Sequence, residues 1–458
     1  MAFLFFEQIV SRGLAHNSYL IGSGTTAAVI DPRRDCRIYL ELASRHECSI
    51  THIFETHRNE DYVIGSLELQ RQCGAEIYHG SRMDFSYGNQ VKESDRFTLG
   101  SLEITVIETP GHTEESISLV VRDPDVSDPP YMVFCGDTLF AGDIARTDFF
   151  GRNRNGEMAE KIFSGITEKL IPLGDGVIVC PAHGAGSVCG GDIADHPFTT
   201  IGYERKTNPV LSLGKERFIE IRRSESPYVP PYFRTMETYN LHGPPVRDKE
   251  PYLRPLTVAE VNAACKTGCQ LIDIRAPTSF SAGHIPGSLS IWRNGISAFL
   301  GWYAGYETPI IFIDDFNQNT EEVYLQCFRM GFDNTSGFLA GGFPAWARAG
   351  QEIATLPACS VRELSERLGT KPVFLLDVRD IRNRRAVGHI PGSVHVYVGE
   401  LPQHLDRVPT GEPVIVYCDA GYKGSLAASY LAAHNYRNVT NVLGGMTAWK
   451  LAGFRIER

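Results

Sequence analysis

Two histidines and one aspartate define the chemistry that the N-terminal half of the chain could perform. His57 follows an apolar run, His112 lies beside a glycine within 109–113, and Asp137 lies beside a glycine within 134–138. Two imidazoles and one carboxylate form the ligand set that suits non-haem Fe(II), and they leave coordination positions for O2 and a substrate. The pattern therefore predicts a site for one Fe(II) ion per chain, with zinc as the alternative metal.

The loop that contains His57 lacks two residues that a dinuclear zinc site would need. A Thr-His-x-His-x-Asp-His loop supplies two histidines to one metal and an Asp-His pair to a second. Here Asn59 stands where the second histidine is required and Tyr62 where the last one is required. Metal-dependent hydrolysis by two ions that share a hydroxide is therefore disfavoured. The substitutions favour oxygen chemistry over hydrolysis.

The length, charge and hydropathy of the chain indicate several domains and exclude some partners. A chain of 458 residues is too long for one hydrophobic core, and about three domains of 100–200 residues is the usual division. The net charge of -10 disfavours nucleic acid and anionic membranes as partners. No window approaches the roughly 18 apolar residues of a membrane span. The sequence leaves open whether the chain forms homo-oligomers.

The cysteines and the start of the chain predict a cytoplasmic location. The 11 cysteines are scattered, unlike a disulfide framework, and most are expected to be buried apolar residues in a reducing compartment. Residues 1–7 lack the basic region of a signal peptide and are expected to form a first strand.

Composition divides the chain into four segments. We expect a metal-binding domain at 1–223, a linker at 224–253, and two further α/β domains at 254–352 and 353–458. Proline fixes extended backbone, so the Pro- and Tyr-rich linker is expected to lack regular elements and to lie over a surface. The first segment alternates apolar strands with helices, which predicts a strand-rich α/β fold with paired sheets. The expected strands are 27–31, 50–55, 103–108, 116–122, 131–135 and 177–180, and the expected helices are 36–46 and 65–73.

The C-terminal half contains an internal repeat. Residues 271–275 recur as 375–379, residues 283–288 recur as 388–393, and each copy ends in Gly-Gly-x3-Trp. The apolar strands of both copies are too continuous for a sheet with one solvated face. Each copy is therefore expected to form a central parallel sheet covered by helices on both sides.

Cys418 is the predicted catalytic nucleophile of the second copy. It follows the buried strand 413–417 and precedes the helix-forming run 425–433. Backbone N–H groups at such a turn point at the sulfur, which is expected to lower the thiol pKa and to stabilise anionic sulfur. The predicted substrate-binding cradle consists of Asp419, Ala420, Gly421, Tyr422 and Lys423.

Two comparisons narrow the chemistry of this loop. The first copy has Asp314 at the place of Cys418, so it offers no nucleophile and is expected to be inactive. A cysteine phosphatase would need Cys-x5-Arg to grip phosphate with two parallel hydrogen bonds, but Gly424 stands at the arginine position. Sulfur transfer is therefore favoured over phosphate chemistry.

The C-terminal half resembles a tandem rhodanese over 255–458. The resemblance rests on the Asp-x-Arg and Gly-His-Ile-Pro-Gly-Ser segments of the repeat, the Cys418 loop and the Gly-Gly-x3-Trp endings. It implies that Cys418 forms a persulfide and passes sulfane sulfur between thiosulfate, persulfide and sulfite. The first copy is similar to the inactive rhodanese modules that accompany active ones.

The N-terminal half resembles the metallo-β-lactamase superfamily, whose fold is an αββα sandwich. Within it, 145–149 is similar to the segment by which persulfide dioxygenases contact the thiol carrier of their substrate. The resemblance implies a single iron at the His57, His112 and Asp137 positions. It also implies that Arg146 orients an anionic carrier such as glutathione. In addition, Asp61 and His183 are expected to hydrogen-bond bound water or substrate from behind the metal ligands.

The whole chain resembles a fusion of a persulfide dioxygenase with a rhodanese. The expected reaction is the iron- and O2-dependent oxidation of a low-molecular-weight persulfide, such as glutathione persulfide, to sulfite. Sulfur transfer through Cys418 would connect this reaction to thiosulfate. Two alternatives remain. One is a zinc thioester hydrolase of glyoxalase II type with an attached sulfurtransferase, and the other is a sulfurtransferase whose N-terminal module is not catalytic.

Overall fold

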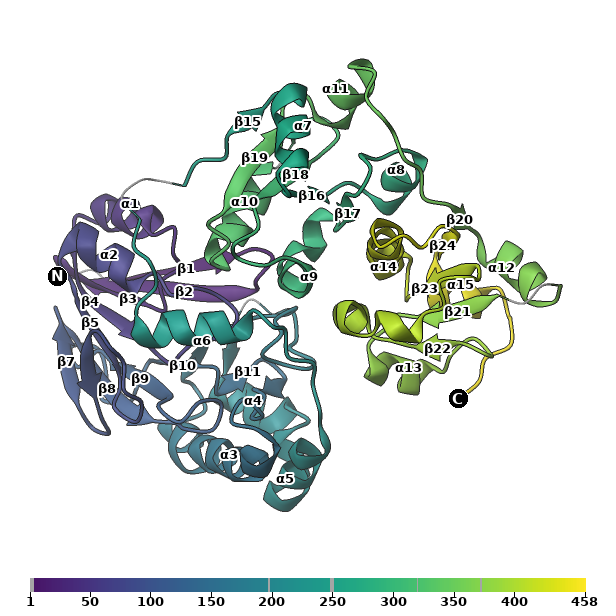
Figure 1. Cartoon of the computed structure of the whole chain (residues 1–458). Helices are drawn as coiled ribbons and strands as arrows, with labels where there is room; N and C mark the ends of the chain where they lie inside the picture. Colours follow the sequence, from purple (N-terminus) through teal and green to yellow (C-terminus); the bar gives the residue numbers. More distant parts are fainter. Residues whose placement is uncertain (1–3, 197, 248–250, 319, 371–372) are drawn as a thin grey trace. The chain divides into compact units, whose positions relative to one another are not determined.

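The computed structural model describes residues 4–196, 198–247, 251–318, 320–370 and 373–458 (Figure 1). Its contacts divide the chain into two compact units. Unit 1 comprises Met1–Pro251 with Phe328–Gly331, and unit 2 comprises Tyr252–Cys327 with Phe332–Arg458. Within the described residues, no helix is long and apolar enough to cross a membrane.

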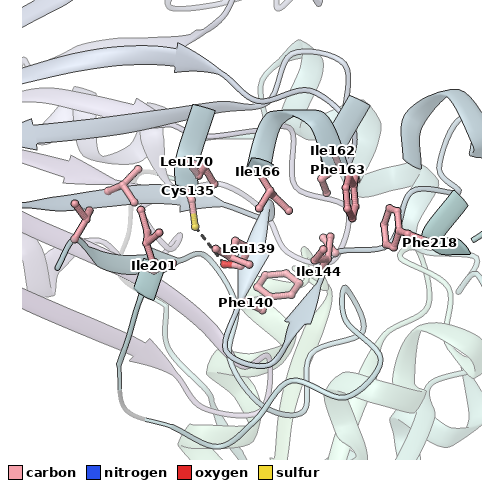
Figure 2. Close-up of a cluster of buried hydrophobic side chains, with 14 of the residues drawn as sticks. Cys135, Leu139, Phe140, Ile144, Ile162, Phe163, Ile166, Leu170, Ile201 and Phe218 are labelled. Atoms are coloured by element: carbon pink, nitrogen blue, oxygen red, sulfur yellow. Dashed lines mark hydrogen bonds between the residues drawn. The ribbon is translucent and has the colours of Figure 1, made fainter. Parts of the chain in front are cut away.

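Unit 1 is an αββα sandwich, as the sequence predicted. Side chains from two six-stranded sheets, such as Phe54 and Phe134, share one buried cluster, so the sheets pack face to face. Residues of α1 and α2 cover the outer face of the first sheet. Residues of α3 and α5, including Ile162 and Phe218, cover the outer face of the second (Figure 2). Both sheets are thus buried on two faces.

The strand order of the first sheet is β1-β2-β3-β4-β5-β6, that of the second is β14-β13-β10-β9-β8-β7, and β11 pairs with β12. The strands are β1 (Leu4–Ser11), β2 (His16–Ser23), β3 (Thr26–Ile30), β4 (Ser49–Glu55), β5 (Glu76–Gly80), β6 (Asn89–Val91), β7 (Arg96–Leu99), β8 (Leu102–Glu108), β9 (Ile117–Arg122), β10 (Met132–Gly136), β11 (Leu139–Phe140), β12 (Asp143–Ile144), β13 (Ile178–Pro181) and β14 (Thr199–Thr200). The helices are α1 (Arg37–Arg45), α2 (Ser66–Cys73), α3 (Arg152–Ser164), α4 (Ile201–Thr207), α5 (Lys215–Ser224) and α6 (Phe233–His242). Every strand and helix predicted in this half is present, and the first strand is confirmed for its described residues.

Unit 2 contains the two repeated α/β modules. Each has a five-stranded sheet whose strands are all parallel, in the orders β15-β19-β18-β16-β17 and β20-β24-β23-β21-β22. The prediction of two tandem modules with parallel sheets is confirmed. The strands are β15 (Pro255–Leu256), β16 (Gln270–Asp273), β17 (Leu289–Ser290), β18 (Ile310–Ile313), β19 (Thr335–Leu339), β20 (Ala358–Cys359), β21 (Phe374–Asp377), β22 (Val394–His395), β23 (Val414–Tyr417) and β24 (Val439–Val442). The helices are α7 (Val258–Lys266), α8 (Pro277–Ala282), α9 (Ile296–Tyr303), α10 (Thr320–Arg329), α11 (Gly342–Arg348), α12 (Val361–Leu368), α13 (Ile381–Val387), α14 (Tyr422–Ala433) and α15 (Gly445–Leu451).

The repeated sequence segments have the same structural task in both modules. In each, an aspartate at the end of a strand binds the arginine two residues later, as Asp273–Arg275 and Asp377–Arg379, and both pairs are buried. The arginines also donate to the carbonyl oxygens of Gly283 and Gly388. These buried pairs join β16 and β21 to the turn that begins the Gly-His-Ile-Pro-Gly-Ser segment of each module.

One expectation about the segment 224–253 is wrong, because residues 233–242 form the regular helix α6. None of the prolines of the segment lies inside the helix, and the two nearest its start, at 230 and 231, precede its first residue, where a missing N–H removes no intrahelical hydrogen bond. Phe233, Met236 and Asn240 are buried. The segment is therefore anchored into unit 1 by a helix, which has a direct consequence for the metal loop.

Candidate metal centre and sulfur-transfer loop

The structure brings His57, His112 and Asp137 together. They follow β4, β8 and β10, and each is at least 98% buried. One ligand atom from each lies within 4.8 Å of the others. Asp137 Oδ2 is 3.4 Å from His112 Nε2 and 3.7 Å from His57 Nε2. The trio predicted from the sequence is therefore spaced to bind one metal ion.

Gly136 permits the close approach of these strands. Its φ is +52°, a value that favours glycine, and a Cβ atom there would lie 2.4 Å from Thr56 Oγ1. Any larger residue would push the Asp137 loop away from His57. The glycine beside Asp137 in the sequence therefore has a steric function.

Hydrogen bonds behind the two histidines fix the tautomer that a metal needs. The Thr56 hydroxyl donates to Asp31 Oδ2, so its oxygen accepts from His57 Nδ1 at 3.0 Å. The Nδ1 of His112 donates to the carbonyl oxygen of Arg146 at 2.9 Å. Both Nε2 atoms then present lone pairs toward Asp137. Both are buried without a hydrogen-bond partner among the described residues, as expected of atoms that bind a cation.

The charges of His57 and Asp137 also suit a divalent cation. At His112, burial lowers the pKa, but Glu60 and Asp137 outweigh it and raise the pKa above its usual value. Burial lowers the pKa of His57 to about 4, so its imidazole is neutral at pH 7. Burial by itself raises the pKa of Asp137, but the nearby His183 and His57 outweigh it, and the pKa lies well below its usual value. A neutral imidazole beside an ionised carboxylate is the protonation state that metal binding requires.

Asp61 and His183 lie directly behind the trio, where the sequence predicted them. His183 Nδ1 contacts both oxygens of Asp137, at 2.8 and 2.9 Å, and His183 Nε2 is 3.1 Å from Asp61 Oδ2. Burial disfavours the charged imidazole, yet the two carboxylates raise the pKa of His183 well above its usual value. His183 therefore orients Asp137.

Helix α6 holds the loop that carries His57. The Asn240 side chain donates to the carbonyl oxygens of Asn59 and Tyr62, at 2.7 and 2.8 Å, and accepts from the Ile64 N–H at 2.9 Å. Sequence reasoning missed this contact, because it joins residues about 180 positions apart and arises from a segment expected to be irregular. It supplies hydrogen-bond partners to three backbone groups of a buried loop.

Replacing Asn240 by alanine is expected to weaken the metal site without touching a ligand. Loss of three hydrogen bonds at about 1 kcal/mol each predicts a fall of about 3 kcal/mol in the free energy of unfolding. Metal affinity should fall about 10- to 100-fold, the usual effect of removing a group that orients ligands. Denaturant unfolding and metal titration measure both effects. Thr238→Ala, which changes an exposed residue of the same helix, should change neither.

Arg146 lies beside the centre, but its guanidinium already forms an ion pair with Asp148. Its Nε and Nη2 donate to Asp148 at 2.7 and 2.8 Å, and its Nη1 donates to the Val188 carbonyl oxygen. Its guanidinium also lies over the Phe149 ring, which packs edge-on against His112. The structure thus shows Arg146 as a support for the wall of the site, and an anionic carrier would have to compete with Asp148 for it.

The Cys418 loop has the predicted strand-to-helix form. Cys418 follows β23, α14 begins at Tyr422, and Gly421 has a φ of +99° that turns its N–H toward the sulfur at 3.0 Å. Lys423 Nζ forms an ion pair with Asp419 at 2.6 Å. The structure therefore brings the predicted cradle residues around Cys418.

The expected direction of the Cys418 pKa is wrong. Burial raises the pKa of the thiol, and this effect exceeds the lowering by backbone hydrogen bonds and by the charge of Lys423. Sequence reasoning identified the N–H groups and the lysine but could not show that the sulfur is almost fully enclosed. The N–H groups and the lysine therefore reduce the rise in the Cys418 pKa that burial causes, but they do not bring the pKa below its usual value.

Replacing Lys423 by methionine is expected to move the pH dependence of sulfur transfer to higher pH. The thiolate is the nucleophile, and removing a nearby positive charge raises the Cys418 pKa further. The higher pKa lowers the thiolate fraction near neutral pH, and the transfer rate is expected to fall with it, about tenfold. A rate profile with thiosulfate against pH measures the change. Lys450→Met, at an exposed position of α15, should leave the profile unchanged.

The first module has an aspartate at the structural position of Cys418. The Phe343 N–H donates to the Asp314 carbonyl oxygen at 2.8 Å, as the Met446 N–H does to that of Cys418 at 2.8 Å. Asp314 is therefore the structural counterpart of Cys418, and the first module has no thiol at this position, as the sequence indicated.

Sequence reasoning missed two further residues of the centre. Glu60 is buried, and its Oε2 is 3.6 Å from His112 Nε2. Cys189 is buried, and it groups with Asp61 and His183 within 4.8 Å. Glu60 lies inside the Thr-His-x-His-x-Asp-His motif, at a position where the motif allows any residue. Cys189 follows His183 by six residues, and only folding brings it back to the centre.

Family models match both halves of the chain. The model of the metallo-beta-lactamase superfamily matches residues 11–183, and the model of the rhodanese-like domain matches 257–349 and 360–452. The metal trio and His183 lie inside the first match. Cys418 lies inside the last.

Named relatives of the N-terminal half include both an oxygenase and a hydrolase. The mitochondrial persulfide dioxygenase of Homo sapiens is 27% identical over 44% of this chain and 74% of its own length. A hydroxyacylglutathione hydrolase of Haemophilus influenzae is 26% identical over 41% of this chain and 87% of its own. A solved metallo-beta-lactamase structure from Staphylococcus aureus is 28% identical with a TM-score of 0.65, covering 74% of this chain and 99% of that one.

Proposed function

We propose that this chain, which belongs to the metallo-β-lactamase superfamily and carries two rhodanese-like domains, is a persulfide dioxygenase joined to a sulfurtransferase. The observation that carries the proposal is the buried set of His57, His112 and Asp137, with both Nε2 atoms directed at the carboxylate and lacking hydrogen-bond partners among the described residues. Two imidazoles and one carboxylate are the ligands that suit non-haem Fe(II).

The proposed reaction converts sulfane sulfur to sulfite. A persulfide R–S–SH, one O2 and one water give the thiol R–SH and sulfurous acid, which ionises to sulfite, so the atoms balance. The terminal sulfur is oxidised, O2 is reduced, and the S–S bond breaks. Bound Fe(II) would supply the site at which O2 and the persulfide react.

The residues of this chain position and shield the reaction. Thr56 and the Arg146 carbonyl hold the two imidazoles, and His183 holds Asp137. Phe149 packs edge-on against His112 and provides an apolar wall beside the trio. In such a water-poor site, fixed dipoles and charges act more strongly than in bulk water. Glutathione persulfide is the proposed substrate of this pocket, although other low-molecular-weight persulfides have the same reacting group.

The proposed second reaction passes sulfur through Cys418. The thiolate attacks the outer sulfur of thiosulfate, the S–S bond breaks, and sulfite leaves while a persulfide forms on Cys418. A small thiolate then attacks that persulfide, carries away the outer sulfur, and restores the Cys418 thiolate. The N–H of Gly421 and the charge of Lys423 offset the negative sulfur at each stage.

A second candidate function is thioester hydrolysis by two zinc ions, and the similarity to the hydroxyacylglutathione hydrolase favours it. Elemental analysis of the chain purified without oxygen separates the two. Near one iron per chain supports the dioxygenase, whereas two zincs and no iron support the hydrolase. If neither metal is bound and His57→Ala changes nothing, the N-terminal module is not catalytic and only the sulfurtransferase remains.

A further inference from the structure

Two cysteines of the first rhodanese-like module lie close together at the surface of unit 2. Cys265 lies in the last turn of α7 and is exposed, whereas Cys269 lies directly before β16 and is half-buried. Both are free thiols. The reactions proposed above use neither of them.

The end of α7 brings Cys269 back toward Cys265. The Gly268 N–H donates to the Cys265 carbonyl oxygen at 3.3 Å, and the Cys269 N–H donates to that of Ala264 at 3.2 Å. These two bonds form a Schellman motif, whose glycine position needs the left-handed backbone that Gly268 adopts with a φ of +88°. The residue after the glycine therefore returns beside the last helical turn, where its side chain meets that of Cys265.

The two thiols hydrogen-bond each other, and this contact makes them unequal. The hydrogen bond from Cys269 lowers the pKa of Cys265 and outweighs the opposing effect of burial. The same bond, together with burial, raises the pKa of Cys269. The exposed sulfur of Cys265 thus forms the thiolate more readily and is the better nucleophile of the pair.

The surroundings of the pair favour thiol chemistry over metal binding. Cys269 packs against the buried cluster that contains Val261 and Leu271, so its position is fixed beside the exposed Cys265. An accessible thiol of low pKa next to a second, resolving thiol is typical of cysteines that respond to oxidants. Within the described residues no third metal-binding side chain joins the pair, whereas a structural zinc site needs four ligands.

The position of the pair also selects among sulfur donors. The C-terminal end of a helix carries partial negative charge, so the end of α7 disfavours thiosulfate, which is a dianion. A persulfide carries less charge on its reacting sulfurs, and its outer sulfur is open to attack by a thiolate. Persulfides are therefore the favoured oxidant for this pair.

We propose that Cys265 and Cys269 form a dithiol site that takes low-molecular-weight persulfides as its substrate, converts them to thiol and sulfide, and becomes a disulfide. The substrate class is that of the proposed dioxygenase, but this reaction needs neither iron nor O2. The site therefore goes beyond the proposed function and does not depend on the metal trio.

The reaction has two displacement steps. The Cys265 thiolate attacks the outer sulfur of R–S–SH, the S–S bond of the persulfide breaks, and the thiolate R–S⁻ leaves and takes up a proton. The Cys269 thiolate then attacks the Sγ atom of Cys265, the disulfide forms, and the outer sulfur leaves as HS⁻. Two cysteine sulfurs are oxidised and one persulfide sulfur is reduced, so atoms and electrons balance. The second step is intramolecular, which favours it over attack by a free thiol.

The test incubates the full-length, iron-loaded chain with glutathione persulfide under anaerobic conditions, where the dioxygenase reaction cannot proceed. Every protein of the series, its parent included, carries Cys418→Ser, which removes the nucleophile of sulfur transfer. After free thiols are blocked, trypsin cuts behind Lys266, so a disulfide between Cys265 and Cys269 keeps two peptides joined until a reductant is added. Mass spectrometry detects the joined peptides, and released sulfide is measured in the same samples. Cys73→Ser, at a half-buried cysteine of α2, is the matched control.

We expect joined peptides and one sulfide released per chain in the parent of the series and in Cys73→Ser. Cys269→Ser should stop at a persulfide on Cys265, with one added sulfur and with sulfide release lower by at least about tenfold. Cys265→Ser, at an exposed position that tolerates the change, should show neither product. Thiosulfate in place of the persulfide should join no peptides.

Absence of joined peptides in the parent would overturn the dithiol site, and so would sulfide release from Cys265→Ser at the parent level. Joined peptides formed equally well with thiosulfate would overturn the assignment of persulfides as the substrate. Failure of the dioxygenase would appear differently, as absence of iron and of O2 uptake in air, and it would leave these anaerobic results unchanged.

Discussion

His57→Ala is expected to lose bound iron and, with it, persulfide-dependent O2 uptake. The variant removes one of the three proposed metal ligands and leaves the buried His112 and Asp137 in place. Because loss of a group that merely orients a ligand costs about 10- to 100-fold in metal affinity, loss of the ligand itself should cost more than about 100-fold. Iron content and the initial rate of O2 uptake at a fixed iron concentration measure the effect.

His52→Ala is the control for this variant. His52 lies on β4, five residues before His57, and is only partly buried among aromatic rings. It should retain iron and activity. Sulfur transfer from thiosulfate should persist in both variants, because Cys418 belongs to unit 2. If His57→Ala kept its iron and its O2 uptake, the trio would not be the metal site.

Cys418→Ser is expected to abolish sulfur transfer while O2 uptake with added glutathione persulfide continues. A hydroxyl in place of the thiol cannot form the persulfide, and loss of a covalent nucleophile should lower the transfer rate by about 10³-fold or more. Thiocyanate formation from thiosulfate and cyanide, or persulfide formation from thiosulfate and a small thiol, measures transfer. Mass spectrometry of the parent protein treated with thiosulfate should detect one added sulfur on Cys418.

Cys359→Ser tests whether the effect belongs to Cys418. Cys359 is buried in β20 of the same module. The Cys359→Ser variant is expected to transfer sulfur at the rate of the parent protein. Equal loss in both variants would indicate a general effect on the module. Unchanged transfer in Cys418→Ser would assign the reaction to another thiol.

Much of the fold and the metal trio could be predicted from the sequence, because the signals are local. β10 is an apolar run, β4 carries the apolar residues Ile50, Ile53 and Phe54, and His57 and Asp137 lie just after these two strands. The parallel modules were evident because the same segments occur twice. The three ligands follow strands of both packed sheets, and the ends of such strands meet at one edge of a sandwich, so their proximity followed from the predicted fold.

The features that could not be predicted depend on contacts between distant segments. Asn240 reaches the metal loop only because α6 forms after two prolines, where proline is compatible with a helix start. Cys189 approaches Asp61 through the return of the segment after β13. The raised pKa of Cys418 reflects the degree of burial, which loop composition does not reveal. Each of these features depends on how distant segments pack together in the folded chain.

The most direct test of the central claim measures O2 uptake and sulfite formation together in iron-loaded protein supplied with glutathione persulfide. The proposed reaction predicts one sulfite formed for each O2 consumed, with glutathione released in the same amount. Absence of O2 uptake together with hydrolysis of a glutathione thioester would contradict the claim and assign the N-terminal half to hydrolysis.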